Sequence, residues 1–98
     1  MAVDINKLCT DICSPAYIFS EDDFDARATL VKNTFGENVD LCFSIKANPF
    51  LLNVMPKSFS KVEVCSPGEL DVCKSLGVSP EMIIFSGVNK SEEEVRLA

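Results

Sequence analysis

The residue best suited to chemistry is Lys46, which follows a short apolar run and precedes an Asn-Pro pair. The residues before it, Leu-Cys-Phe-Ser-Ile, are rich in strand-forming side chains. We predict a strand over residues 40–46, followed by a helix over residues 49–55 with Asn48 as its N-cap and Pro49 at its first position. A lysine at the carboxyl end of a buried strand lies where α/β barrels keep their chemistry. Its amine could act there as a nucleophile toward a carbonyl group.

The alternation of side chains along this strand predicts two unlike faces. The apolar face is bulky and suited to packing under helices. It consists of Leu41, Phe43 and Ile45. The other face is small and polar and ends in the amine. It consists of Cys42, Ser44 and Lys46.

A second candidate is Glu63, within a strand predicted over residues 61–65. Val62 and Val64 share one face of this strand, whereas Glu63 and Cys65 share the other. A carboxylate inside so short a strand is unusual unless its face is polar. We therefore expect Glu63 either to contact a bound group or to pair with a neighbouring lysine.

Further along the chain, helix starts alternate with strands. Residues 66–69, Ser-Pro-Gly-Glu, form a capping box with proline at the first helical position, and Gly77 is expected to end that helix. Residues 82–86 form a continuous apolar run, which predicts a strand buried on both faces. Ser91 is expected to cap a last helix with three glutamates in its first turn. The buried side of the helix after residue 66 is predicted to be Leu70, Cys73 and Leu76.

The first third of the chain predicts a short amphipathic helix over residues 5–12, a strand over residues 15–19, and a longer helix. Ser20 is the expected N-cap of the longer helix, acidic residues fill its first turn, and Gly36 ends it. Its apolar stripe is expected to pack in the core. The stripe is Phe24, Ala28, Val31 and Phe35.

Helices and strands therefore alternate with short connections, which predicts an α/β fold of parallel strands joined by right-handed crossovers. The pattern alone leaves a doubly wound sheet and an opened barrel as alternatives. The first strand is not followed by Gly-x-Gly-x-x-Gly. This absence weighs against a dinucleotide-binding domain.

Composition narrows the classes of function. The 98 residues carry a net charge of −6 and no basic cluster, which argues against nucleic acid and anionic membranes as partners. The first residues have neither a long apolar run nor the pattern of a secretory signal, and five cysteines suggest reduced thiols in the cytoplasm. Cys9 and Cys13 could form half of a metal site, but the chain has no histidine and no matching second pair. We therefore predict no metal.

Residues 43–49, Phe-Ser-Ile-Lys-Ala-Asn-Pro, resemble the lysine motif of the pyridoxal-phosphate (PLP) decarboxylases with an alanine-racemase-like barrel. This family includes diaminopimelate, ornithine and arginine decarboxylases, and its motif has alanine where this chain has Ser44. The resemblance implies that Lys46 is the catalytic residue and forms the Schiff base with pyridoxal 5′-phosphate. It also implies that Ser44 lies at the cofactor site and that the fold is the N-terminal portion of a PLP-binding (β/α)8 TIM-type barrel.

Two later stretches resemble the same family. Residues 63–70 are similar to its Asp-x-x-Ser-x-x-Glu motif, which places Glu63 near the cofactor in the position of the usual, shorter aspartate. Glu69 matches too, although the capping box already accounts for it. Residues 83–91 are similar to a stretch that often reads His-Gly-Asn-Asn-Lys in diaminopimelate decarboxylases. There Ser86 replaces the histidine and Val88 the first asparagine, while Asn89 and Lys90 match and could equally be polar loop residues.

A complete barrel needs about 250 residues. Residues 1–98 are therefore expected to be the N-terminal part of a barrel domain that lacks its C-terminal β-domain, including the partner of the strand over residues 15–19. We expect the fragment alone to bind PLP poorly, to be inactive and to associate. The full-length protein is expected to be a cytoplasmic homodimer that decarboxylates a small-molecule substrate, an amino acid of the diaminopimelate type, in lysine biosynthesis.

Two alternatives remain. An amino-acid racemase of the same fold resembles the chain at Lys46, but racemases continue with Ala-Tyr-Gly, so Pro49 favours a decarboxylase. A non-catalytic relative of the barrel is the other, and the presence of Lys46 speaks against it.

Overall fold

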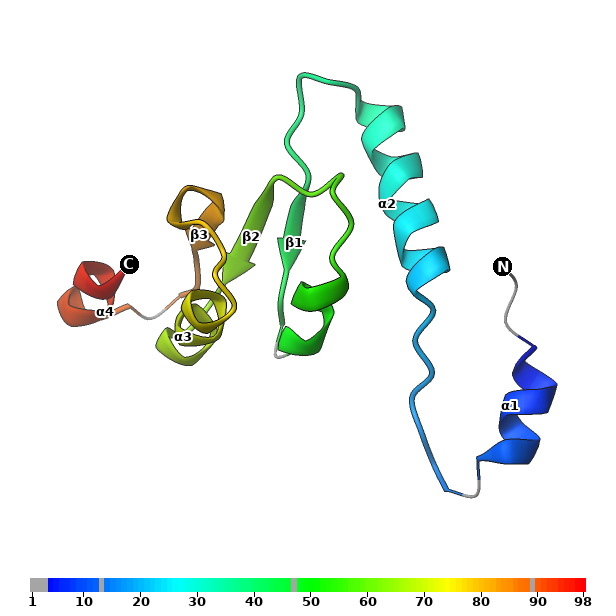
Figure 1. The fold of residues 1–98 in the computed structure, drawn as a ribbon. Coiled ribbons are helices and arrows are strands. Elements are labelled where there is room, and N and C mark those ends of the chain that lie inside the picture. Colours follow the sequence, from blue (N-terminus) through cyan, green and yellow to red (C-terminus); the bar gives the residue numbers. More distant parts are fainter. Residues whose placement is uncertain (1–3, 13, 47, 89) are drawn as a thin grey trace.

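The computed structural model describes residues 4–12, 14–46, 48–88 and 90–98. Its sheet has three strands: β1 (Cys42–Ser44), β2 (Lys61–Val64) and β3 (Ile83–Phe85). They are parallel and lie side by side in chain order. The prediction of an α/β fold with sequential parallel strands is confirmed. The sheet is open, so it is consistent with the first part of a barrel but is not itself a barrel (Figure 1).

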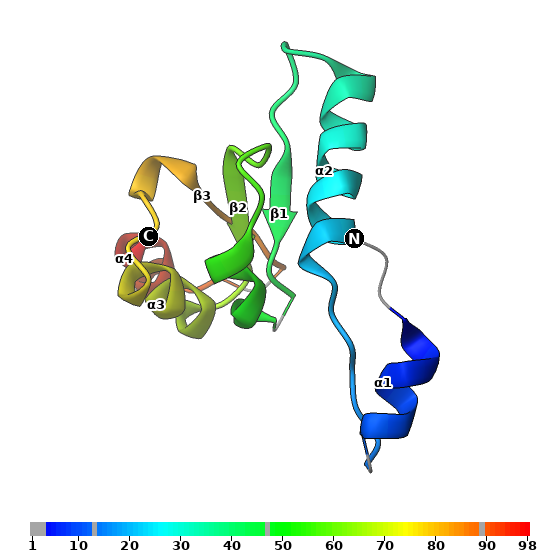
Figure 2. The same cartoon turned by 45° about the vertical axis from the view of Figure 1, so that its right-hand side comes forward.

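The described part of the chain also has four α-helices and two 3₁₀ helices, of which the two 3₁₀ helices and the third α-helix lie between strands. They are α1 (Ile5–Asp11), α2 (Glu21–Phe35), η1 (Pro49–Val54), α3 (Pro67–Ser75), η2 (Pro80–Met82) and α4 (Glu92–Leu97). The predicted caps of α2 and α4 are confirmed: the Ser20 hydroxyl accepts from the Asp23 N–H, and Ser91 and Glu94 form a capping box. Both views place α2 alongside β1, whereas α1 lies apart from the sheet (Figures 1 and 2).

The core lies on one face of the sheet. Its fully buried members are Ile45, Val62, Val64, Leu70 and Cys73. The two valines are 0% exposed, and burying such a side chain contributes about 1.5–3 kcal/mol. The predicted alternation in the first two strands is therefore confirmed, with the apolar face turned toward η1 and α3.

A cluster of phenylalanines joins α2 to the sheet. The ring centroid of Phe24 lies 5.6 Å from that of Phe43 and 5.7 Å from that of Phe59, and Phe43 and Phe59 are 5.4 Å apart. Ala28, one turn further along α2, is 2% exposed. At the far end of the helix Phe35 is 64% exposed, so the prediction of a buried stripe is wrong at that position.

The strand predicted over residues 15–19 is wrong, because this segment is irregular and pairs with none of the three strands. A strand needs a neighbour for its backbone groups. The segment instead runs between α1 and α2, with Tyr17 fully exposed and Phe19 packed edge-on against Phe24 at 5.6 Å.

Other boundaries differ more modestly. The first strand covers only Cys42–Ser44, and residues 49–54 form a 3₁₀ helix in which Asn48 makes no side-chain capping bond. Leu76 is 43% exposed because α3 ends at Ser75. Ile84 is 46% exposed, so β3 is not buried on both faces. Its side chain shares the polar face with Glu63, opposite the side on which the core packs.

Candidate functional site

Lys46 directly follows the last buried residue of the first strand region, and its side chain is exposed. Its φ angle is +47°, and it is the one non-glycine residue with a positive φ in the part of the chain that the structure describes. The Asn48 N–H donates to the Ile45 carbonyl at 2.9 Å and closes a turn around it. The left-handed conformation costs a residue such as lysine about 1–2 kcal/mol. Strain of this kind concentrates at functional sites.

Glu63 lies on the polar face of the sheet, in the middle strand. Its register partner on β1 is Ser44, whose hydroxyl donates to Glu63 Oε2. From the end of β3, the Ser86 hydroxyl donates to Glu63 Oε1. Both carboxylate oxygens are therefore held by hydroxyl groups of the two neighbouring strands.

The surroundings of Glu63 favour its ionised form. The hydrogen bonds from Ser44 and then Ser86 lower the pKa of this carboxyl group below its usual value, and the positive charges of Lys46 and Lys90 lower it further. Partial burial raises the pKa but does not offset these effects. The sequence left two roles for Glu63, contact with a bound group or pairing with a lysine. The lysines act on it only through their charge, and its direct contacts are the hydroxyl groups of Ser44 and Ser86.

Two cysteines border this cluster. Cys65 Sγ lies 3.5 Å from Ser86 Oγ. Burial, together with the negative charge of Glu63, raises the pKa of the Cys42 thiol, and Lys61 opposes the shift. No group of three or more histidine, cysteine, aspartate or glutamate side chains placed to hold a metal ion was found among the described residues.

The start of α3 is occupied by the chain's own groups. The Ser66 hydroxyl accepts from the Glu69 N–H at 3.2 Å, and Glu69 Oε2 accepts from the Cys65 N–H at 2.7 Å. The predicted N-cap Ser66 is confirmed, whereas the Glu69 carboxylate bonds to the Cys65 N–H, one residue before the N–H that a capping box uses. Glu69 is therefore engaged in local structure. An anion approaching this helix end would meet its carboxylate, so the start of α3 offers no anion site.

The stretch over residues 83–91 contributes one site residue that the sequence did not predict. Ser86 is in the cluster, although its replacement of histidine had suggested no role. Lys90 Nζ donates to the Gly87 carbonyl at 2.9 Å and lies 5.0 Å from the centre of the Phe85 ring, so it has local partners. Val88 is fully exposed, and Asn89 lies outside the described residues.

The structure thus brings together Ser44, Glu63 and Ser86, and it places Lys46 at the same end of the sheet. The signal that could have found Ser86 is strand alternation. It lies two residues after Ile84, the register partner of Glu63, and so shares the face of Glu63.

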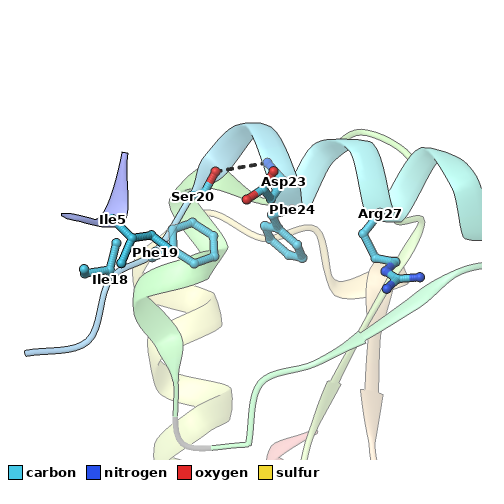
Figure 3. A pocket seen from close by; sticks show the side chains of 7 residues that line it. All are labelled: Ile5, Ile18, Phe19, Ser20, Asp23, Phe24 and Arg27. Carbon is cyan, nitrogen blue, oxygen red and sulfur yellow. Dashed lines mark hydrogen bonds between the residues drawn. The ribbon is translucent and has the colours of Figure 1, made fainter. Parts of the chain in front are cut away.

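A pocket lies elsewhere, between α1 and the start of α2 (Figure 3). Its volume is about 440 Å³. Ile5, Ile18 and Phe19 contribute apolar surface, and Asp23 and Arg27 contribute charges. None of the predicted site residues lines it.

The described helices include none long and apolar enough to cross a membrane.

Comparison with known proteins identifies the family to which the chain belongs. Residues 21–98 match the family described as pyridoxal-dependent decarboxylase, pyridoxal binding domain. Diaminopimelate decarboxylase of Aquifex aeolicus is 28% identical over 95 residues, which are 95% of this chain and 22% of that protein. The Pseudomonas fluorescens enzyme of the same name is 33% identical over 103 residues, or 98% of this chain and 24% of that protein. The chain therefore spans about a quarter of the length of these relatives.

Proposed function

Because this chain belongs to the pyridoxal-dependent decarboxylases, whose pyridoxal-binding domain it matches over residues 21–98, we propose that the whole protein decarboxylates an amino acid of the diaminopimelate type. It would be a carbon–carbon lyase. The cofactor is pyridoxal phosphate, which when bound supplies an acceptor for the electrons left behind as the α-carboxylate departs as CO₂.

The observation that carries this proposal is the setting of Lys46. Its amine is exposed at the carboxyl end of β1, on a residue held in a strained backbone conformation. The carboxylate of Glu63 is near enough for the two charges to interact. An amine is the group that attaches an aldehyde covalently, so we assign the covalent attachment of the cofactor to Lys46.

The polar side chains on this face of the sheet fit the reactive end of the cofactor. Ser44 and Glu63 flank the end of the strand that carries Lys46, and they offer a hydroxyl group and a charged carboxylate to a polar ring. We therefore propose them as cofactor contacts. Their role is to orient the attached group and to set the charge beside it.

The phosphate needs backbone amides or cations. The start of α3 is unsuitable because Glu69 occupies it. We expect the phosphate contacts to come from the three quarters of the relatives' length that this chain does not span. From the family match we also propose that residues 1–98 are the first part of a PLP-binding (β/α)8 barrel domain, in a cytoplasmic homodimer that serves lysine biosynthesis.

The test is release of CO₂ from diaminopimelate by the complete gene product with added PLP, with ornithine and arginine as comparison substrates. We expect release from diaminopimelate, its loss in Lys46→Ala, and its retention in Lys74→Ala, a change on the outer helix α3. Racemisation without CO₂ release would favour the racemase alternative. Activity that survives in Lys46→Ala would contradict the role of that residue.

A further inference from the structure

We propose that Ser86 is a positioning residue of this site, which acts with Ser44 to fix the Glu63 carboxylate between β1 and β3 beside Lys46. The effect on the cofactor rests on the function proposed above. The positioning itself rests only on the geometry of the three side chains.

The direction of each hydrogen bond follows from the number of protons available. A serine hydroxyl group has one proton, and an ionised carboxylate can only accept. Ser44 and Ser86 therefore both spend their proton on Glu63, one on each oxygen. Because the Ser86 proton is already used, the contact of 3.5 Å between Cys65 Sγ and Ser86 Oγ must be donated by the thiol. The result is a directed series from Cys65 to Ser86 to Glu63.

The length of the Glu63 side chain suits this arrangement. A shorter aspartate at position 63 would withdraw the carboxylate toward β2 by about 1.5 Å, the length of one carbon–carbon bond. The hydrogen bonds from Ser44 and Ser86 would then both lengthen.

A carboxylate fixed in this way is ionised at neutral pH, and its negative charge is close enough to interact with that of Lys46. The lowered pKa of Glu63 agrees with that geometry. Such a charge favours the protonated form of a nitrogen close to it. In the loaded protein, Glu63 would thus keep the nitrogen that links Lys46 to the cofactor protonated at higher pH.

The first experiment needs no cofactor. Glutamate labelled with ¹³C at the carboxyl group is followed by NMR as the complete gene product is titrated. The Glu63 midpoint is expected below the usual 4.5 in the parent protein and closer to 4.5 in Ser86→Ala. Ser86→Thr, which keeps the hydroxyl group, should restore the parent midpoint. Ser75→Ala is the control: the Ser75 hydroxyl group donates to the Asp71 carbonyl within α3, so its removal should leave the Glu63 midpoint unchanged.

The second experiment uses the PLP-loaded protein. The pH midpoint of the absorbance of the lysine-bound cofactor is expected to fall in Ser86→Ala and in Glu63→Asp, and to recover in Ser86→Thr. A Ser86→Ala protein with the parent midpoint for Glu63 in the NMR titration would overturn the inference. Failure of PLP to attach to Lys46 would instead contradict the proposed function, and the NMR titration would still decide the role of Ser86.

Discussion

Among single residues, Glu63 is one on which hydrogen bonds and nearby positive charges act together, and both lower the pKa of its carboxyl group. Each carboxylate oxygen of Glu63 accepts a hydrogen bond from a serine hydroxyl group, and both hydrogen bonds favour the ionised form. Its pKa in the folded protein is therefore lower than its pKa in the unfolded chain. A group with a lowered pKa stabilises the fold above its unfolded pKa, and this contribution disappears as the pH falls through the folded value.

We therefore predict that Glu63→Gln lowers the free energy of unfolding at about pH 7 and has a smaller effect below about pH 4, where protons compete with the folded carboxylate. Urea unfolding at both pH values measures the difference. Glu37→Gln, an exposed residue in the turn after α2, is the matched control and should change little at either pH. An effect of Glu63→Gln that is equal at both pH values would exclude this electrostatic explanation.

At the scale of elements, the polar cluster joins all three strands, and the loop after β3 fits closely against the end of β2. Gly87 has a φ angle of +116°. A Cβ atom there would lie 3.3 Å from the Cys65 carbonyl oxygen and 3.3 Å from Lys90 Nζ. Glycine is required at this position for both its conformation and its small size.

Gly87→Ala is accordingly expected to destabilise the protein by about 1–3 kcal/mol. Gly68→Ala in α3 is the control, since its Cβ would meet only Ser66 Oγ at 3.9 Å. Alanine in a helix should stabilise by about 0.5–1 kcal/mol relative to glycine. Thermal unfolding of the two variants should therefore shift in opposite directions. Equal shifts would show that the close approach at Gly87 is not important.

Local pattern was sufficient for some of these features. Alternation alone put Val62 and Val64 on one face and Glu63 on the other, because the pleat is a property of each strand, and the structure buries the two valines in the core. The register that brings Ser44 and Ser86 to Glu63 depends on pairing between distant segments, which periodicity does not report. The left-handed conformation of Lys46 was also not predictable, since lysine has no intrinsic preference for it.

At the scale of the whole molecule, the chain is more extended than a closed domain. Its radius of gyration is 16.3 Å, compared with about 13 Å for a compact domain of 100 residues. Within the described part of the chain, β1 and β3 each pair along one edge only. Ile84 adds exposed apolar surface on the polar face of the sheet. Unpaired edges and exposed apolar surface both promote association.

We predict that the 98-residue chain by itself associates at micromolar concentration. Light scattering after size-exclusion chromatography should give a mass above the 10.7 kDa of the monomer. Ile84→Lys, which puts a charge on the exposed sheet face, should reduce the associated fraction, whereas Thr10→Lys on α1 should not. A monodisperse monomer with a sharp cooperative thermal transition would contradict this prediction.

Lys46 is the residue expected to carry the cofactor. The complete gene product is incubated with PLP, reduced with borohydride and digested, and the peptides are mapped by mass spectrometry. We expect the pyridoxyl group on Lys46, and no label at this position in Lys46→Arg. Labelling of Lys61 or Lys90 in place of Lys46, or an unlabelled protein, would contradict the claim.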